Sequence, residues 1–228
     1  MDFSIKNLWV VNIAGIEIWI TETIVNTWVI MLLLIVAAVV IRIKLRKFQQ
    51  VPKGFQNVVE MMIEAFDNFV RTSAGEKYMY LGNWFFMVFA FLLVSNISGV
   101  VGIRPPTADF ATTFAFALAT FILSHAMGII QRKGKYLKSF FEPTFIFFPL
   151  NVIGEISRPI SLSFRLFGNV LAGMILMTII YALFPVYLRL IIPAALHAYF
   201  DLFTGALQTY IFCVLSLTFI SSAATASE

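Results

Sequence analysis

The chain is poor in charged residues and in cysteine. Only 12% of its 228 residues are charged and 60% are hydrophobic, whereas a soluble globular domain carries about 25% charged residues. This composition excludes a soluble globular protein and predicts one whose solvent is lipid. The single cysteine, Cys213, can form neither an internal disulfide nor a multi-cysteine metal site, so we expect no metal centre.

Two motifs are also missing. The first residues are acidic and contain tryptophan (Asp2, Trp9, Glu17), and they lack the basic region and the A-x-A site of a cleaved secretory signal. We therefore expect the first hydrophobic segment to remain in the protein. The sequence also lacks G-x-x-x-x-G-K-S/T, so we expect no nucleotide cofactor and no catalytic activity from this chain alone.

Apolar residues are abundant, and the apolar runs in the first part of the chain predict three membrane spans. Residues 23–41, 78–101 and 110–130 are each long enough to cross about 30 Å of hydrocarbon. Basic clusters follow the first and third runs, and the positive-inside rule puts both in the cytoplasm, with residues 1–22 outside it. The net charge of +4 then reflects loop orientation and not nucleic-acid binding. The clusters are Arg42, Lys44, Arg46, Lys47 and Lys53, and then Arg132, Lys133, Lys135 and Lys138.

Between the first two spans, the pattern predicts an amphipathic helix over residues 55–70. Pro52 and Gly54 break the chain before it, and apolar residues then recur at i, i+3, i+4 and i+7. We expect this helix to lie at the cytoplasmic surface or against partner helices. Further along, Asp109 is placed to cap the span that follows it. The apolar face comprises Phe55, Val58, Val59, Met62, Ile63, Phe66, Phe69 and Val70.

The remaining sequence, residues 145–222, forms two segments longer than a perpendicular span requires. They are divided near residues 184–189, where Pro185 and Pro193 interrupt the pattern. A strongly tilted hairpin, or one lying obliquely against another protein, satisfies this length. The predicted fold is therefore all-α: one polytopic membrane domain, 1–228, of five to six helices. It comprises the extracytoplasmic segment 1–22, the first spans with the amphipathic surface helix over 23–144, and the hairpin over 145–228.

Each helix of this hairpin carries a polar stripe. At 100° per residue, the first stripe falls within roughly 80° of one helix face, and the second has spacings i, i+4, i+7 and i+11. Ionisable groups at membrane depth cost several kcal/mol, so they occur with a partner, a water-filled cavity or a function. The first stripe comprises Asn151, Glu155, Arg158, Arg165 and Asn169, and the second His197, Asp201, Thr204 and Gln208.

The chemistry of these side chains suits ion transport. Arg165 stays charged at any working pH, so it can favour the ionised form of a carboxylate on a partner and block the leak of cations. Asn169 and Gln208 can orient this arginine, and Asp201 can pass on a proton or contact Na⁺ transiently. Structural alternatives remain open: an interfacial Glu155–Arg158 pair, an interfacial His197, a buried ion pair of Arg165, and a locally satisfied Asp201.

Residues 157–169, SRPISLSFRLFGN, resemble the signature of subunit a of the F-type ATP synthase. Two further motifs occur in the family's order, PPTAD at residues 105–109 and QTYIF at residues 208–212. The resemblance covers the chain from the first span onward.

This resemblance implies an ion-translocating stator subunit, in which two aqueous half-channels pass H⁺ or Na⁺ to and from the carboxylates of a rotating c-subunit ring. Arg165 would prevent a short circuit, with Asn169 as its neighbour and Gln208 facing it. Asp201 would serve the extracytoplasmic half-channel, and Glu155 and Asn151 the cytoplasmic one. The implied partners are the c-ring, the b-subunit peripheral stalk, the remaining ATP synthase subunits and the lipid of a bacterial plasma membrane.

The sequence departs from the family's pattern at three positions. Met174 stands where certain bacterial members have glutamate, Asp201 where those members have histidine, and Ala111 where many have asparagine. The acid is thus moved between helices. Two other classes of function compete with this interpretation: a stand-alone ion channel or secondary transporter, and a structural membrane anchor. The absence of internal repeats disfavours a repeat-built transporter, and the charged stripe disfavours an anchor.

Overall fold

The computed structural model describes residues 7–13, 16–45, 52–185 and 188–225. The chain forms two compact units that alternate along the sequence. Unit 1 comprises Met1–Ala37, Ala90–Thr113 and Phe164–Tyr210. Unit 2 comprises Ala38–Phe89, Phe114–Ser163 and Ile211–Glu228.

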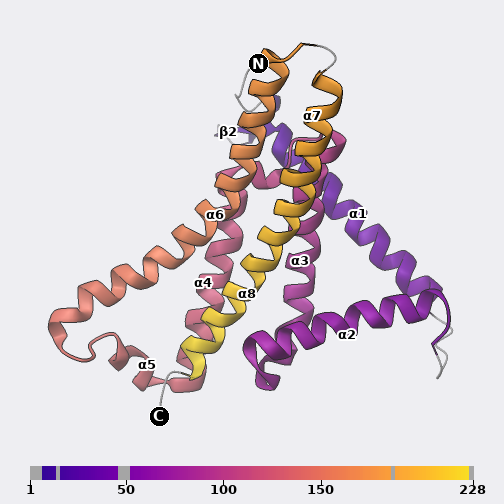
Figure 1. Cartoon of the computed structure of the whole chain (residues 1–228). Coiled ribbons are helices and arrows are strands. Elements are labelled where there is room, and N and C mark those ends of the chain that lie inside the picture. The colour runs from indigo at the N-terminus through magenta and orange to yellow at the C-terminus, as the bar shows by residue number, and fades with distance from the viewer. Residues whose placement is uncertain (1–6, 14–15, 46–51, 186–187, 226–228) are drawn as a thin grey trace. The chain divides into compact units, whose positions relative to one another are not determined.

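Five helical runs in the described residues are long and apolar enough to cross a membrane. The first is α1 (Glu22–Lys44), and the second joins the short helix η1 (Glu76–Leu81), α3 (Gly82–Ile97) and η2 (Ser98–Val101). The third is α4 (Phe110–Arg132), and the fourth joins η4 (Phe145–Phe147) to the long helix α6 (Phe148–Leu183), seen in Figure 1. The last lies within α7 (Leu188–His197), η5 (Ala198–Thr204) and α8 (Gly205–Thr225). The predicted all-α polytopic membrane fold is confirmed.

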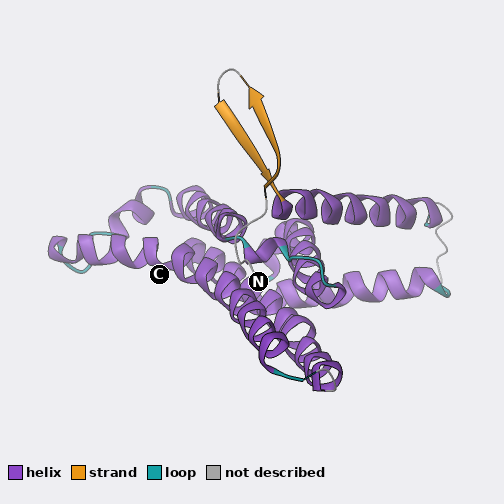
Figure 2. Cartoon of the chain, turned by 90° about the horizontal axis from the view of Figure 1, so that it is seen from above, coloured by secondary structure: helices purple, strands orange, loops and turns teal. Residues whose placement is uncertain are grey.

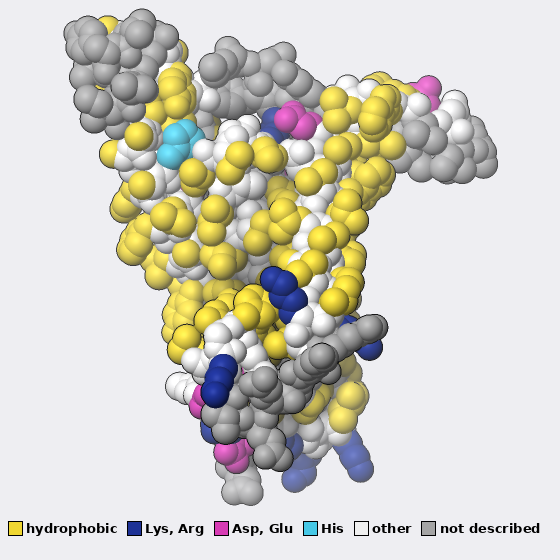
Figure 3. All heavy atoms as spheres, turned by 90° about the vertical axis from the view of Figure 1, so that its right-hand side faces the viewer, with side chains coloured by type: hydrophobic (Ala, Val, Ile, Leu, Met, Phe, Trp, Pro, Cys, Tyr) yellow, Lys and Arg dark blue, Asp and Glu magenta, His cyan; other side chains and the backbone are white. Residues whose placement is uncertain are grey.

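The surface of the described residues suits a lipid environment. In the face that Figure 3 presents, hydrophobic side chains cover most of the described surface, and charged side chains are few. The first helix is the extreme case, because only Thr23 and Ile30 are buried along α1. An apolar helix with so little burial is stable only when lipid covers the rest of it.

The predicted amphipathic helix is α2 (Phe55–Ala74), which follows Gly54 with its φ of +58°. The C-terminal half of its apolar face packs inside unit 2: Val70 is fully buried, and the Phe66 ring lies 5.2 Å from that of Phe86. The N-terminal half stays exposed, including Val58 and Met62. Only part of the apolar face is therefore covered within this chain.

One element was not expected from the sequence. Strands β1 (Asn7–Ile13) and β2 (Ile16–Thr21) form an antiparallel hairpin in which Val10 pairs with Trp19, and Figure 2 shows it as the paired strands. In β2, isoleucine alternates with Glu17, Trp19 and Thr21, which is the period-2 signal of a strand. The sequence therefore contained a strand signal within the predicted N-terminal segment, residues 1–22.

The predicted helix start at Asp109 is confirmed. Asp109 precedes α4, and its Oδ1 accepts a hydrogen bond from the Ala111 amide at 3.0 Å, which satisfies one of the free N–H groups of the first turn. Its Oδ2 accepts from the Thr23 hydroxyl at 3.1 Å, so the same carboxylate ties α1 to α4 within unit 1.

The two long C-terminal runs are divided where expected, although one proline behaves differently. Pro185 follows α6, whose last residue is Leu183. Pro193 does not interrupt the pattern, because it lies inside α7. A helix tolerates proline where other groups satisfy the freed carbonyl, and α6 likewise contains Pro159.

The buried side-chain amide of Asn96 connects several segments of unit 1. Asn96 in α3 donates from Nδ2 to the Gly205 carbonyl and to the Thr209 hydroxyl, each at 3.0 Å, and accepts from the Thr107 hydroxyl at 2.7 Å. Asn96 is 2% exposed. Thr107 lies in η3 (Pro106–Ala108), so this one side chain connects α3 to α8 and to the loop before α4.

Unit 2 also has polar contacts between its helices. The hydroxyls of Thr120 and Ser216 lie 3.2 Å apart between α4 and α8, and the Ser124 hydroxyl donates to the Phe219 carbonyl at 3.1 Å. The short helix α5 (Gly134–Ser139) follows α4. Its Tyr136 ring fills the space beside Gly128, where a Cβ would lie 2.5 Å from Cε2.

Candidate functional site

The polar residues that the sequence predicts fall into two groups. Asn151, Glu155 and Arg158 belong to unit 2, on the N-terminal part of α6. The others belong to unit 1, on the C-terminal part of α6 and on the segments α7, η5 and α8. These unit 1 residues are Arg165, Asn169, His197, Asp201, Thr204 and Gln208.

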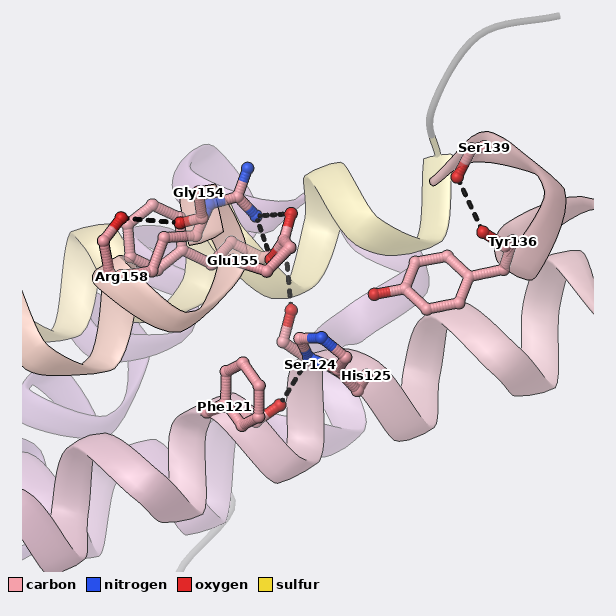
Figure 4. Close-up of polar contacts among 10 residues, drawn as sticks. Phe121, Ser124, His125, Tyr136, Ser139, Gly154, Glu155 and Arg158 are labelled. Atoms are coloured by element: carbon pink, nitrogen blue, oxygen red, sulfur yellow. Dashed lines mark hydrogen bonds and ion pairs between the residues drawn. The ribbon is translucent and has the colours of Figure 1, made fainter. Parts of the chain in front are cut away.

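In unit 2, Glu155 and Arg158 form an ion pair one helical turn apart. Arg158 Nη1 lies 2.8 Å from Glu155 Oε1 and donates to Oε2 at 2.9 Å, as Figure 4 shows. The guanidinium also lies over the Phe219 ring of α8, 5.2 Å from its centroid. The two charges thus neutralise each other within unit 2. This agrees with the pairing of Glu155 and Arg158 that the sequence analysis gave as a structural alternative.

A cavity of about 540 Å³ opens beside this pair. Asn151 lies at its edge and donates from Nδ2 to the carbonyls of Phe140 and Glu142 at 2.9 and 3.1 Å, which holds the α5–α6 connection against α6. The cavity is large enough for many water molecules. Its lining contains both arginines and both carboxylates of this region: Arg132, Glu142, Glu155 and Arg158, with Tyr136, Ser139, Asn151 and Ser222 among the others.

Tyr136 is a cavity residue that the sequence interpretation missed. Its ring extends from α5 toward Ser124 and the Glu155–Arg158 pair (Figure 4). Burial raises the pKa of its phenol above the ordinary value of 10.0, and the negative charge of Glu155 raises it further, while Arg158 and Arg132 oppose the rise. The phenol is therefore neutral and able to donate a hydrogen bond throughout the physiological range.

His125 is a second residue that was missed. It lies in α4, its Nδ1 is 3.0 Å from the Phe121 carbonyl, and its ring lies against the Phe121 ring at 4.0 Å (Figure 4). With Glu155 and Arg158 it lines a small second pocket. An ionisable residue inside a membrane span is a functional candidate by its position alone, and that signal was available in the sequence.

In unit 1, Arg165 is exposed and forms no hydrogen bond or ion pair with the described residues. It lies near the middle of the membrane-length run Phe145–Leu183. Its neighbours Phe164 and Phe167 lie against Phe110, with ring centroids 4.9 and 5.8 Å apart. The described residues therefore provide no counter-charge for this arginine.

Asn169 and Gln208 are brought together between α6 and α8. Asn169 Nδ2 donates to Gln208 Oε1 at 3.4 Å, a long hydrogen bond. Gln208 is 5% exposed, and its Nε2 has no hydrogen-bond partner among the described residues. A buried amide without an acceptor costs about 1–3 kcal/mol, so Gln208 has a donor that is still available.

Asp201 and His197 form the third contact. His197 Nδ1 lies 2.5 Å from Asp201 Oδ2, across one turn that includes the start of the π-helical segment η5. Both side chains are partly accessible, at 28% and 20%. Thr204, predicted on the same stripe, forms no hydrogen bond to Asp201 among the described residues. No three His, Cys, Asp or Glu side chains gather as a metal site in the described part of the chain.

A sequence model of the ATP synthase A chain matches residues 24–221. The chain belongs to this family. It is 35% identical over 206 residues to ATP synthase subunit a of Moorella thermoacetica, covering 89% of this chain and 90% of the relative. It is 37% identical over 212 residues to ATP synthase subunit a 2 of a Picosynechococcus species, covering 92% and 88%.

The name of a third relative specifies its ion. The chain is 35% identical over 223 residues to the sodium ion specific ATP synthase subunit a of Propionigenium modestum, covering 88% of this chain and 73% of the relative. Membership of the ATP synthase A chain family makes this chain an ion-translocating subunit of a rotary ATP synthase. It is a multi-pass membrane protein and a component of a multisubunit complex.

Proposed function

We propose that the chain forms two aqueous half-channels that carry ions to and from a ring of c subunits, with Arg165 as the fixed charge facing the ring carboxylates. The observation that carries this proposal is the exposed Arg165 guanidinium, halfway along a membrane-length helix and without a counter-charge among the described residues. A charge at this depth requires a partner or water. A carboxylate of the ring meets that requirement in passing.

Arg165 suits this task because its guanidinium does not release its proton at working pH. It favours the ionised form of a nearby carboxylate, so the carboxylate gives up its ion as it approaches. The same fixed charge repels cations and prevents direct leakage between the half-channels. Asn169 and the Nε2 group of Gln208, which has no partner among the described residues, extend the polar surface on which this exchange occurs.

We assign the extracytoplasmic half-channel to unit 1 and the cytoplasmic half-channel to unit 2. All lysine and arginine residues belong to unit 2 except Lys6, Arg104, Arg165 and Arg189. The positive-inside rule favours a cytoplasmic position for the basic clusters that follow α1 and α4. This assignment leaves the N-terminal segment outside the cytoplasm of a bacterial plasma membrane.

Each half-channel then has its own polar groups. In unit 1, Asp201 and His197 share a short contact and remain partly accessible, so they can take up an ion from water. In unit 2, the 540 Å³ cavity beside Glu155 and Asn151 provides a wet path. ATP chemistry belongs to other subunits, and the c-ring and the b-subunit stalk are the membrane partners.

The test is ATP-driven ion uptake by liposomes that contain the intact complex with Arg165→Ala. We expect assembly to persist and uptake to vanish. Arg71→Ala is the matched control, since the ion pair of Arg71 with Glu76 is exposed and contributes little. Repeating the assay with Na⁺ and with a protonophore separates a proton current from Na⁺ pumping. Uptake by Arg165→Ala near the wild-type rate would exclude the proposed role and favour the stand-alone channel.

A further inference from the structure

Asp201 lies against a glycine of another helical segment of unit 1. A Cβ built on Gly99, in η2, would lie 2.9 Å from Cγ of Asp201 and 3.0 and 3.1 Å from its carboxylate oxygens. At the shortest of these distances the Asp201 side chain would have to shift, and the other two are tighter than most Cβ contacts. Gly99 does not have a positive φ, unlike Gly54, Gly75 and Gly102. Glycine at position 99 therefore makes room for the carboxylate where it lies, and it is not there to permit an unusual backbone conformation.

The same kind of contact occurs in reverse about one turn away, before Gly99 in one segment and after Asp201 in the other. A Cβ on Gly205 would lie 2.9 Å from Cβ of Asn96. Asn96 precedes Gly99 by three residues, and Asp201 precedes Gly205 by four. Each segment thus offers a glycine to the polar side chain of the other, and the hydrogen bonds of Asn96 to Gly205 and Thr209 fix their separation.

The two polar side chains differ in how they are held. Asn96 is buried and forms three hydrogen bonds. Asp201 has one side-chain partner among the described residues, His197, and is otherwise confined by the close approach of Gly99. The segment η2, Ser98–Val101, contributes no titratable side chain. Gly99 therefore limits the position of the carboxylate without adding a charge.

We propose that Gly99 is a positioning residue for ion translocation: its missing Cβ keeps the Asp201 carboxylate beside η2, and the position of this carboxylate matters more than the helix that carries it. This inference rests on the proposed role of Asp201 in the unit 1 half-channel. Gly99 has no functional group in its side chain, so its role can be tested by substitution.

The first experiment compares Gly99→Ala with Gly134→Ala in the reconstituted complex. A Cβ at Gly134 would meet nothing within 4 Å, so this control adds the same methyl group without displacement. A displaced reacting group costs up to about a hundredfold in rate, and we expect Gly99→Ala to lower ATP-driven uptake at least about tenfold. Uptake equal to that of an assembled Gly134→Ala complex would overturn the proposal.

The second experiment moves the acid. Asp201→Ala removes it, and Gly99→Asp combined with Asp201→Ala restores a carboxylate to the same space from η2. We expect the double variant to recover uptake that the single Asp201→Ala variant lacks, which a purely structural role of Gly99 would not produce. A double variant as inactive as Asp201→Ala overturns the proposal. This comparison also decides the matter if Gly99→Ala does not assemble.

The same set separates this inference from the proposed function. Normal uptake by Asp201→Ala would contradict the role of Asp201 itself, and the inference would fall with it. Loss of uptake by Asp201→Ala together with normal uptake by Gly99→Ala would leave the half-channel proposal intact and refute only the positioning role of Gly99.

Discussion

Units 1 and 2 both contain charged groups in apolar surroundings, but they compensate them differently. In unit 2, Glu155 and Arg158 neutralise each other beside an open cavity. In unit 1, Arg165 has no counter-charge among the described residues, and Asp201 contacts His197 and lies against Gly99. Because the cavity of unit 2 is large enough for water, we expect water to soften the removal of one group of the pair. In unit 1, no charged group among the described residues pairs with Arg165 in this way, so we expect the charges of unit 1 to dominate transport.

The largest predicted effect contrasts the two carboxylates. Asp201→Asn and Glu155→Gln each keep the shape of the side chain and remove its titration. Because a positioned proton-transfer group contributes about 10²–10⁴-fold, we expect Asp201→Asn to lower ATP-driven uptake by about 10²-fold or more. Water in the cavity can replace Glu155, so the Glu155→Gln complex should retain uptake within about tenfold of wild type. Equal losses in the two reconstituted variants would remove the contrast between the units.

An intermediate effect concerns stability. Asn96→Ala leaves the buried Thr107 hydroxyl without its acceptor, and we expect a loss of about 1–3 kcal/mol. Thr120→Val removes one hydroxyl contact in unit 2 while keeping the shape, and the expected loss is about 0.6 kcal/mol.

The measurement for this pair is the temperature at which the detergent-solubilised complex loses this subunit on heating. Asn96→Ala should lower that temperature clearly more than Thr120→Val does. The reverse order would mean that the amide of Asn96 is not the main polar tie of unit 1.

The smallest effect is a pair of opposite pKa shifts at Tyr136. Burial, and then Glu155, raise the pKa of this phenol above 10.0, so its contribution to stability is complete below pH 10.0 and is lost as the pH rises through the raised pKa. Glu155→Gln should lower this pKa, and Arg158→Gln should raise it. Phenolate absorbance of each complex, minus that of its Tyr136→Phe counterpart, measures both shifts. Shifts of the same sign would contradict the cavity electrostatics.

Local patterns predicted most of the helices. Apolar length and basic ends gave the region of α1, and the Asp109 cap gave the start of α4, because these signals act over a few residues. The i, i+4 spacing put His197 and Asp201 on one stripe, where they are in contact. The same spacing does not identify the strands β1 and β2, because the alternation in β2 has a period of two residues and not of a helical turn.

Contacts between distant parts of the chain were beyond sequence reasoning. Asp201 lies against Gly99, although the two residues are 102 positions apart in the sequence. No periodicity within either segment indicates this contact. The unit 2 cavity likewise combines Arg132 and Tyr136 with α6. The sequence pattern identifies which polar residues share a helix face, whereas packing between helices decides which of them keep a counter-charge.

The sparse contacts of α1 have a consequence for the biogenesis of the protein. Only 6% of its apolar stretch is buried, and its side-chain hydrogen bonds to later described segments lie near its start, where Thr23 donates to Asp109 and Asn26 to the Arg104 carbonyl at 3.0 Å. Such a helix can insert into the bilayer before the later spans are synthesised and dock onto them afterwards, as the two-stage view of membrane folding describes. We expect the hydrogen bonds of Thr23 and Asn26 to form, and so to dock α1, once the loop before α4 has been synthesised.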